Sequence, residues 1–142
     1  MNCKFCDLLK ENNNETFICK MGYGSLYLNI NQIFRGRSIY IFHEHIKDVT
    51  FIDIDKFADV DREIIIVSKV LKKIFKPQLM NVASLGNHVQ HLHWHIIPRY
   101  SDDPNWGNPP WPHGEKILTP PEYKKLTEEI YQELKQSLNC CV

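Results

Sequence analysis

Three histidines alternate with apolar residues in the segment His-Leu-His-Trp-His-Ile-Ile-Pro, which spans residues 91–98. Successive side chains of a β-strand point to opposite faces, so an extended segment would place all three imidazoles on one face and the apolar side chains on the other. In an α-helix the first and third histidines would share a face, and the middle one would point away. The β-branched pair Ile96-Ile97 and the proline after it favour a strand that ends before Pro98.

Only a few explanations account for a row of imidazoles on one face of a strand. They could be exposed or core histidines that alternate by coincidence. The functional alternatives are a metal site, or a nucleophilic histidine with two helpers. In the metal version, the three histidines hold a catalytic ion and leave one position open for water. The residues concerned are His91, His93 and His95.

Length and charge limit the partners of this chain. Its 142 residues predict a single domain, 1–142. The 17 basic and 17 acidic residues cancel, so no basic field is available to attract a nucleic acid polymer or an anionic membrane. The apolar run Ile64–Val67 is too short to span a bilayer. A small phosphate ligand remains compatible, because it needs only local donors.

The chain has five cysteines and no apolar leader segment, which predicts reduced thiols and a cytoplasmic location. Cys140 and Cys141 end the chain and are interpreted as bystanders, with palmitoylation as the alternative. Cys3 and Cys6 form a Cys-x-x-Cys pair within an N-terminal segment, residues 1–14. They supply half of a four-ligand zinc site, so two ligands must come from elsewhere, unless the two cysteines are unrelated.

Hydrophobic periodicity predicts an α+β fold with an antiparallel sheet of about five strands, because the strands follow one another through tight turns. The predicted strands are 16–19, 25–30, 38–42, 79–83 and the histidine segment.

Two helices complete this prediction. Apolar positions spaced by three and four predict one long helix that is capped by Asp53 or Asp55 and ends near Phe75. A Thr-Pro-Pro-Glu capping box opens a C-terminal helix, 119–138. Between the histidine segment and this helix lies a long loop, 101–118, rich in proline and tryptophan.

The pattern His-Leu-His-Trp-His-Ile-Ile resembles the signature of the histidine triad (HIT) superfamily, in which histidines alternate with apolar residues. The flanking Gly86-Asn87 and Pro98-Arg99 also resemble the family. The similarity is strongest over 28–45 and 81–99 and weak from Ser101 onward.

This resemblance implies a nucleotide hydrolase or transferase that acts at the α-phosphorus, for instance on a dinucleoside polyphosphate or a nucleoside phosphoramidate. His93 would attack the phosphorus and form a covalent nucleotidyl-histidine that water resolves. His95 would donate to a non-bridging phosphate oxygen, where charge grows in the transition state.

The resemblance also implies substrate contacts. Asn29 occupies the place of the residue that grips the ribose hydroxyls. Asn87 stands where glutamine is common, and His88 where Ser or Thr is common; His88 could protonate the leaving group or point to solvent. Arg37 replaces a histidine and could still reach phosphate.

Some family members carry a structural zinc held by an N-terminal Cys-x-x-Cys and two histidines. By resemblance the ligands here would be Cys3, Cys6, His45 and His91, with His43 as the competing choice for the third. This assignment gives His91 a structural task beside its place in the triad. No organic cofactor is expected.

Two alternatives to the covalent hydrolase remain: the metalloenzyme described above, and a non-catalytic nucleotide-binding protein that retains the fold. Family members usually dimerise through the first long helix and a sheet edge, so a homodimer is expected.

Overall fold

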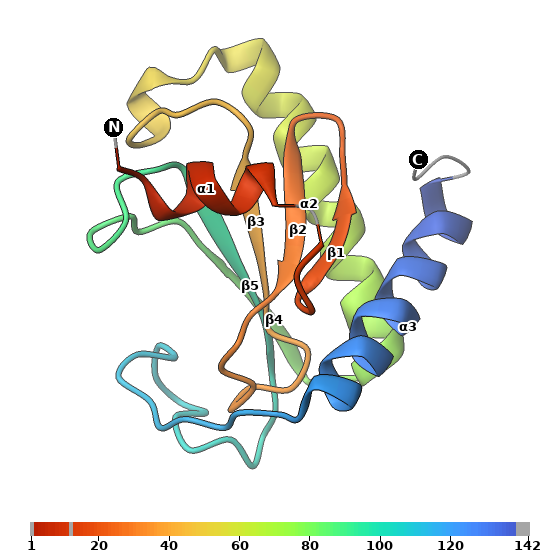
Figure 1. Cartoon of the computed structure of the whole chain (residues 1–142). Helices are drawn as coiled ribbons and strands as arrows, with labels where there is room; N and C mark the ends of the chain where they lie inside the picture. Colours follow the sequence, from red (N-terminus) through yellow and green to blue (C-terminus); the bar gives the residue numbers. More distant parts are fainter. Residues whose placement is uncertain (1, 12, 139–142) are drawn as a thin grey trace.

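The computed structural model describes residues 2–11 and 13–138 and contains the predicted α+β fold (Figure 1). Its sheet is antiparallel, with strand order β1-β2-β3-β5-β4. The strands are β1 Phe17–Lys20, β2 Gly24–Leu28, β3 Ser38–Phe42, β4 Leu79–Ala83 and β5 His93–Arg99. The helices are α1 Lys4–Lys10, the 3-10 turn η1 Val49–Phe51, α2 Ile54–Phe75 and α3 Pro120–Leu138.

The two faces of the sheet pack against different partners. Tyr40 pairs with Trp94, and both side chains join the main core beneath α2 and α3. Ile39 pairs with His95 and Ile41 with His93 on the opposite face. That face is crossed by α1, whose Phe5 packs in a smaller apolar cluster with Ile39 and Ile41 (Figure 1). The predicted alternation therefore holds along β5, and it turns His93 and His95 toward α1.

The boundaries of the triad strand differ from the prediction. The strand begins at His93, so His91 lies just before it. It also continues through Pro98 to Arg99. The carbonyl of Arg99 accepts from the N–H of Gln78 on the β4 side. Because the backbone groups of successive strand residues point to opposite sides, the backbone nitrogen of Pro98 points toward β3. Pairing with β3 has already ended at Ile96, so a residue without an N–H breaks no ladder hydrogen bond there.

Capping residues set the ends of both long helices. Of the two candidate caps, Asp53 caps α2 by accepting from the N–H groups of Asp55 and Lys56. The predicted capping box of α3 is present, since the N–H of Thr119 donates to Glu122 at 2.7 Å. Cys140 and Cys141 lie outside the described residues. Among the described helices, none combines the length and apolar character that crossing a bilayer requires.

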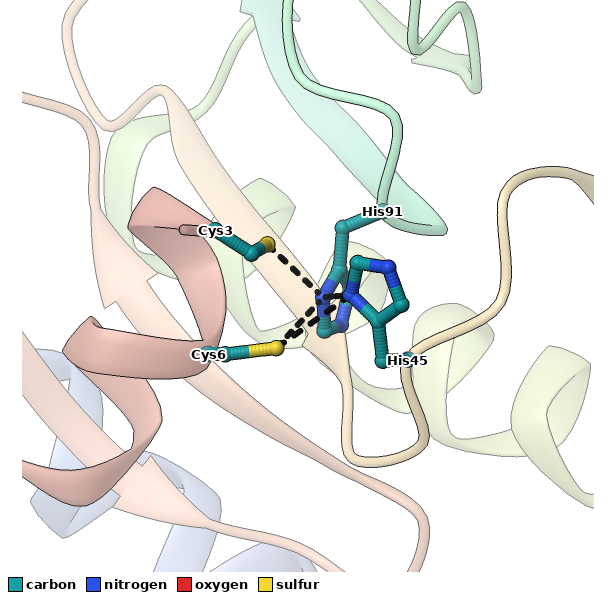
Figure 2. A group of neighbouring side chains, drawn as sticks. All are labelled: Cys3, Cys6, His45 and His91. Atoms are coloured by element: carbon teal, nitrogen blue, oxygen red, sulfur yellow. Dashed lines mark hydrogen bonds between the residues drawn. The ribbon is translucent and has the colours of Figure 1, made fainter. Parts of the chain in front are cut away.

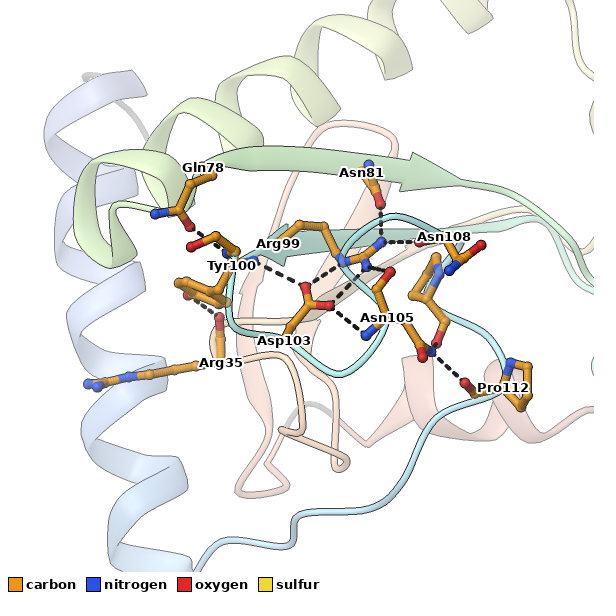
Figure 3. A network of polar contacts seen from close by, with 11 residues as sticks. Arg35, Gln78, Asn81, Arg99, Tyr100, Asp103, Asn105, Asn108 and Pro112 are labelled. Atoms are coloured by element: carbon orange, nitrogen blue, oxygen red, sulfur yellow. Dashed lines mark hydrogen bonds and ion pairs between the residues drawn. The ribbon is translucent and has the colours of Figure 1, made fainter.

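The loop that follows β5 contains neither helix nor strand over 101–118 and is held by one buried arginine (Figure 3). Arg99 forms an ion pair with Asp103, in which both side chains are at most 3% exposed. Its remaining N–H groups donate to Asn81 Oδ1 and to the carbonyls of Asn105 and Asn108. The first part of this loop is therefore fixed against the end of the sheet.

Candidate active site and metal centre

Two thiols and two imidazoles from three separate segments meet beside α1 (Figure 2). Cys3 and Cys6 come from the start of α1, His45 from the segment after β3, and His91 from the residues before β5. Their ligand atoms all lie within 4.8 Å of one another, and this is the only such Cys/His/Asp/Glu group among residues 2–11 and 13–138.

The spacing of these atoms suits a tetrahedral zinc ion. His91 Nδ1 lies 3.5 Å from each sulfur, and His45 Nδ1 lies 3.3 Å from Cys6 Sγ and 3.2 Å from His91 Nδ1. Usual zinc bond lengths and tetrahedral angles require about 3.5 Å between sulfur and nitrogen and about 3.3 Å between two nitrogens.

The hydrogen bonds of His91 and His43 support the same ligand set. His91 Nε2–H donates to the carbonyl of Phe42 at 2.7 Å, which leaves the lone pair of Nδ1 directed at the cluster. His43 lies outside the group, and its Nε2 is 3.1 Å from Ser25 Oγ. Of the two candidates for the third ligand, the geometry therefore selects His45.

His93 is held as a neutral imidazole with one nitrogen available. Its Nδ1–H donates to the carbonyl of His91 at 2.6 Å, so Nε2 carries the lone pair. The ring of Phe5 contacts it edge-on with centroids 4.8 Å apart, and only 5% of the residue is exposed. Burial lowers the pKa of His93, which favours the neutral form that a nucleophile requires.

His95 lies beside His93 and contains a polar atom without a partner. The two ring centroids are 5.1 Å apart. His95 Nδ1 is buried and makes no hydrogen bond to any residue of 2–11 or 13–138, and the indole of Trp111 lies 5.2 Å from the imidazole. Burial, followed by the positive charge of Arg37, lowers the pKa of His95 to about 3. The imidazole is therefore neutral near pH 7.

Arg37 is 5% exposed and lies against the same tryptophan. Its guanidinium carbon is 5.5 Å from the centre of the Trp111 ring, and an N–H on Nη1 donates to His113 Nε2 at 2.8 Å. Its Nε is buried and has no hydrogen-bond partner in the described part of the chain. Burial lowers the pKa of Arg37 to about 10, so the guanidinium remains charged near pH 7.

The sequence analysis missed His113. Its only signal was a histidine close to a tryptophan in the loop after the triad, and that did not show which strand the loop would cover. In the structure, His113 Nδ1–H donates to the carbonyl of Gly114 at 2.7 Å, which leaves Nε2 as the acceptor for Arg37.

The remaining predicted contacts form no hydrogen bond with these groups within the described residues. Asn29 is half-buried just after β2, and its side chain accepts from the N–H of Asn31 at 2.9 Å. Asn87 and His88 are exposed between β4 and β5 and form no hydrogen bond within the described chain. The three triad imidazoles do not surround a common point, because His91 Nδ1 faces the thiols and His93 Nδ1 faces a carbonyl.

A groove of about 750 Å³ adjoins the His95 end of the site. It is lined by β4 and by the loop that contains Trp106 and Trp111. Ala83, one of its lining residues, is the register partner of His95. A ligand at His95 therefore has open space beside it.

The site therefore combines a neutral, buried His93 that has a free lone pair, a second imidazole beside it at His95, and the buried cation of Arg37, whose charge acts on His95. The HIT domain family model matches residues 10–102, and the chain belongs to the HIT family.

Known proteins of similar sequence and fold agree with this membership. The adenosine 5'-monophosphoramidase hnt1 of Schizosaccharomyces pombe is 28% identical, over 95% of this chain and all of its own. A histidine triad protein of Sinorhizobium meliloti has a TM-score of 0.80 at 25% identity, covering 93% of this chain and 97% of its own. A zinc-bound histidine triad family protein of Mycobacterium smegmatis has a TM-score of 0.76 at 17% identity, covering 98% and 97%.

Proposed function

We propose that this protein hydrolyses nucleotide conjugates at the α-phosphorus through a covalent nucleotidyl-histidine on His93. The observation that carries the proposal is the 2.6 Å hydrogen bond from His93 Nδ1–H to the carbonyl of His91, which leaves Nε2 as the nucleophile. The name of the Schizosaccharomyces pombe relative, adenosine 5'-monophosphoramidase, supports the same reaction class.

In the first step the lone pair of His93 Nε2 attacks phosphorus, and the bond to the leaving group breaks. The leaving group takes the electron pair and accepts a proton from a solvent water. The carbonyl of His91 stabilises the positive charge that develops on the His93 ring. An N–H of His95 and the guanidinium of Arg37 stabilise the phosphate oxygens. In the second step water attacks phosphorus and releases a proton to solvent, while the P–N bond breaks and its electron pair returns to Nε2, so that His93 is restored as the neutral imidazole.

Other contacts in this proposal come from the HIT resemblance. Asn29 holds the ribose hydroxyls, while Asn87 and His88 lie on the leaving-group side. The exposed positions of Asn87 and His88 leave room for a substrate to reach them. The reduced thiols of the metal cluster suit a cytoplasmic protein.

The nucleophile is tested by replacing it. His93→Ala should reduce turnover of diadenosine polyphosphates and of AMP phosphoramidates by at least about 1,000-fold, because the covalent route is lost. Mass spectrometry of acid-quenched wild type should show one AMP attached to a peptide containing His93. His43→Gln, at a histidine outside the site, is the matched histidine control.

If His93→Ala keeps full turnover, the mechanism is wrong. Nucleotide binding by the wild type without turnover of either substrate would favour the non-catalytic alternative.

We also propose that Cys3, Cys6, His45 and His91 bind a structural zinc ion. When bound, the ion holds α1 against the sheet and supplies no reacting group. The near-tetrahedral spacing of the four ligand atoms supports this, as does the zinc reported for the mycobacterial family protein. Because Phe5 lies between the two cysteines and packs on His93, a zinc ion held by Cys3 and Cys6 would also help to keep Phe5 against the His93 ring.

We further propose that the protein forms a homodimer through the free edge of β4 and the face of α2. β4 is a sheet edge, and its Leu79 and Val82 are about half exposed, as is Ile65 on α2. Light scattering should give the mass of a dimer for the wild type and of a monomer for Val82→Glu. A wild-type monomer at micromolar concentration would contradict this arrangement.

A further inference from the structure

Two buried arginines in this protein differ in how their charge and hydrogen-bond donors are satisfied. Arg99 is 2% exposed, pairs with a carboxylate and uses each of its nitrogens in hydrogen bonds (Figure 3). Arg37 is 5% exposed, yet no carboxylate within the described chain forms an ion pair with it. Because a buried charge without a counterion costs free energy, Arg37 requires an explanation that Arg99 does not.

The unpaired polar atoms gather at one place. Within the described residues, the only buried side-chain nitrogens or oxygens without a hydrogen-bond partner are Arg37 Nε and His95 Nδ1. Both residues contact Trp111, at 5.5 Å and 5.2 Å from its ring centre. A cation and an imidazole that share one aromatic wall, each with an unused polar atom, form a pocket for an anion.

Among the residues that the structure describes, the Arg37 guanidinium has a single hydrogen-bond acceptor, and it comes from the long loop. His113 Nε2 accepts from Arg37 at 2.8 Å, and its other ring nitrogen is fixed on the carbonyl of Gly114. A neutral imidazole orients a guanidinium without neutralising it, whereas a carboxylate would compete with the ligand for the charge.

We propose that His113 is a positioning residue, which holds the Arg37 guanidinium beside His95 so that the two bind the substrate's reacting phosphate. This inference rests on the proposed function for the identity of the phosphate. It makes the loop 101–118 a functional part of the active site, since Trp111 supplies the wall and His113 the acceptor.

Ligand binding without turnover tests the proposal. In the zinc-loaded full chain carrying His93→Ala, the affinities for AMP and for adenosine are measured by calorimetry. Adding His113→Phe keeps the ring volume but removes the acceptor, and it should weaken AMP binding by about 10-fold or more while adenosine affinity stays the same. Adding His113→Gln, whose carbonyl oxygen can take the place of Nε2, should restore AMP affinity to within about 3-fold. Glu115→Gln, an exposed neighbour in the same loop, is the matched control and should change neither.

A double-mutant cycle separates positioning from an independent contact. If His113 acts through Arg37, then Arg37→Met alone should cost as much AMP affinity as Arg37→Met with His113→Phe. Additive losses would overturn the proposal, and so would equal losses for AMP and adenosine, which indicate a general distortion of the loop. These binding results do not depend on turnover, so a failure of the hydrolase proposal would be recognised separately by the His93 experiment.

Discussion

The two ends of the histidine triad lie a few residues apart and differ in one physical respect. At the His91 end, the imidazole uses both nitrogens, one on the carbonyl of Phe42 and one toward two thiols and His45. At the His95 end, a ring nitrogen and the Nε of Arg37 are buried and find no hydrogen-bond partner among the described residues. His93 lies between them and takes its fixed tautomer from the backbone of His91.

This difference separates structure from function within one motif. Buried polar groups are normally hydrogen-bonded, so the completed contacts at His91 indicate a part that stabilises the fold. The incomplete contacts at His95 indicate a part whose partners arrive with the substrate. The same contrast separates Arg99 from Arg37. Removing groups at the first end should reduce stability, and removing groups at the second should reduce ligand binding.

The largest expected effect is loss of the metal cluster. The double substitution Cys3→Ser and Cys6→Ser should abolish tight zinc binding and lower the melting temperature by about 10 °C or more, because zinc binding is coupled to folding. Zinc content by mass spectrometry of the purified protein and thermal unfolding are the two measurements.

Two single histidine substitutions sharpen this prediction. His45→Gln should behave like the double cysteine variant, whereas His43→Gln should retain stoichiometric zinc. Tight zinc binding and activity retained in the cysteine double variant would instead support the metalloenzyme alternative, in which the triad itself holds the ion. That result would remove the distinction between the two ends.

Sequence periodicity predicted much of this arrangement and missed particular parts of it. The five strands and the facing of His93 and His95 follow from local alternation, which depends only on neighbouring residues. Alternation does not show where pairing begins, so the exit of His91 from the strand was not predicted. Its assignment to zinc came from the family resemblance, and the structure brings those four side chains together.

The contact of His113 with Arg37 shows why the rest of the site could not be predicted from the sequence. It meets Arg37 across 76 positions of sequence, in a loop with no periodic pattern. The loop path is set by the ion pair of Arg99 and Asp103 and by the hydrogen bonds around it. Such contacts depend on the finished sheet, which local residue patterns do not specify. The unpaired nitrogens that distinguish Arg37 from Arg99 are also visible only in three dimensions.

The next largest effect is expected on breaking the ion pair between Arg99 and Asp103, which anchors the loop 101–118. Asp103→Asn leaves Arg99 charged and buried without a counterion, which should lower the free energy of unfolding by about 3 kcal/mol. Because the same loop carries Trp111 and His113, AMP affinity should fall as well, while zinc content stays unchanged. Asp102→Asn, its exposed neighbour, is the control. Loss of zinc together with nucleotide binding would show that the two ends are not independent.

The smallest effect is a change in the pH dependence of stability at His95. Its pKa is about 3 in the folded protein against 6.5 ordinarily, so between these values the unfolded chain binds a proton that the folded chain does not. The stabilising contribution of neutral His95 is therefore complete above pH 6.5 and is lost as pH falls below it.

His95→Gln removes this pH-dependent contribution, so urea unfolding from pH 7 to pH 4 should show a smaller loss of stability for the variant than for the wild type. Proton competition at the Cys/His cluster acts equally in both proteins and cancels in the difference. The groups that face His95, which are Arg37, His93 and His113, are the same in both proteins. Parallel stability curves over this range would show that His95 is not held neutral by its burial, and the contrast between the two ends would then rest on Arg37 alone.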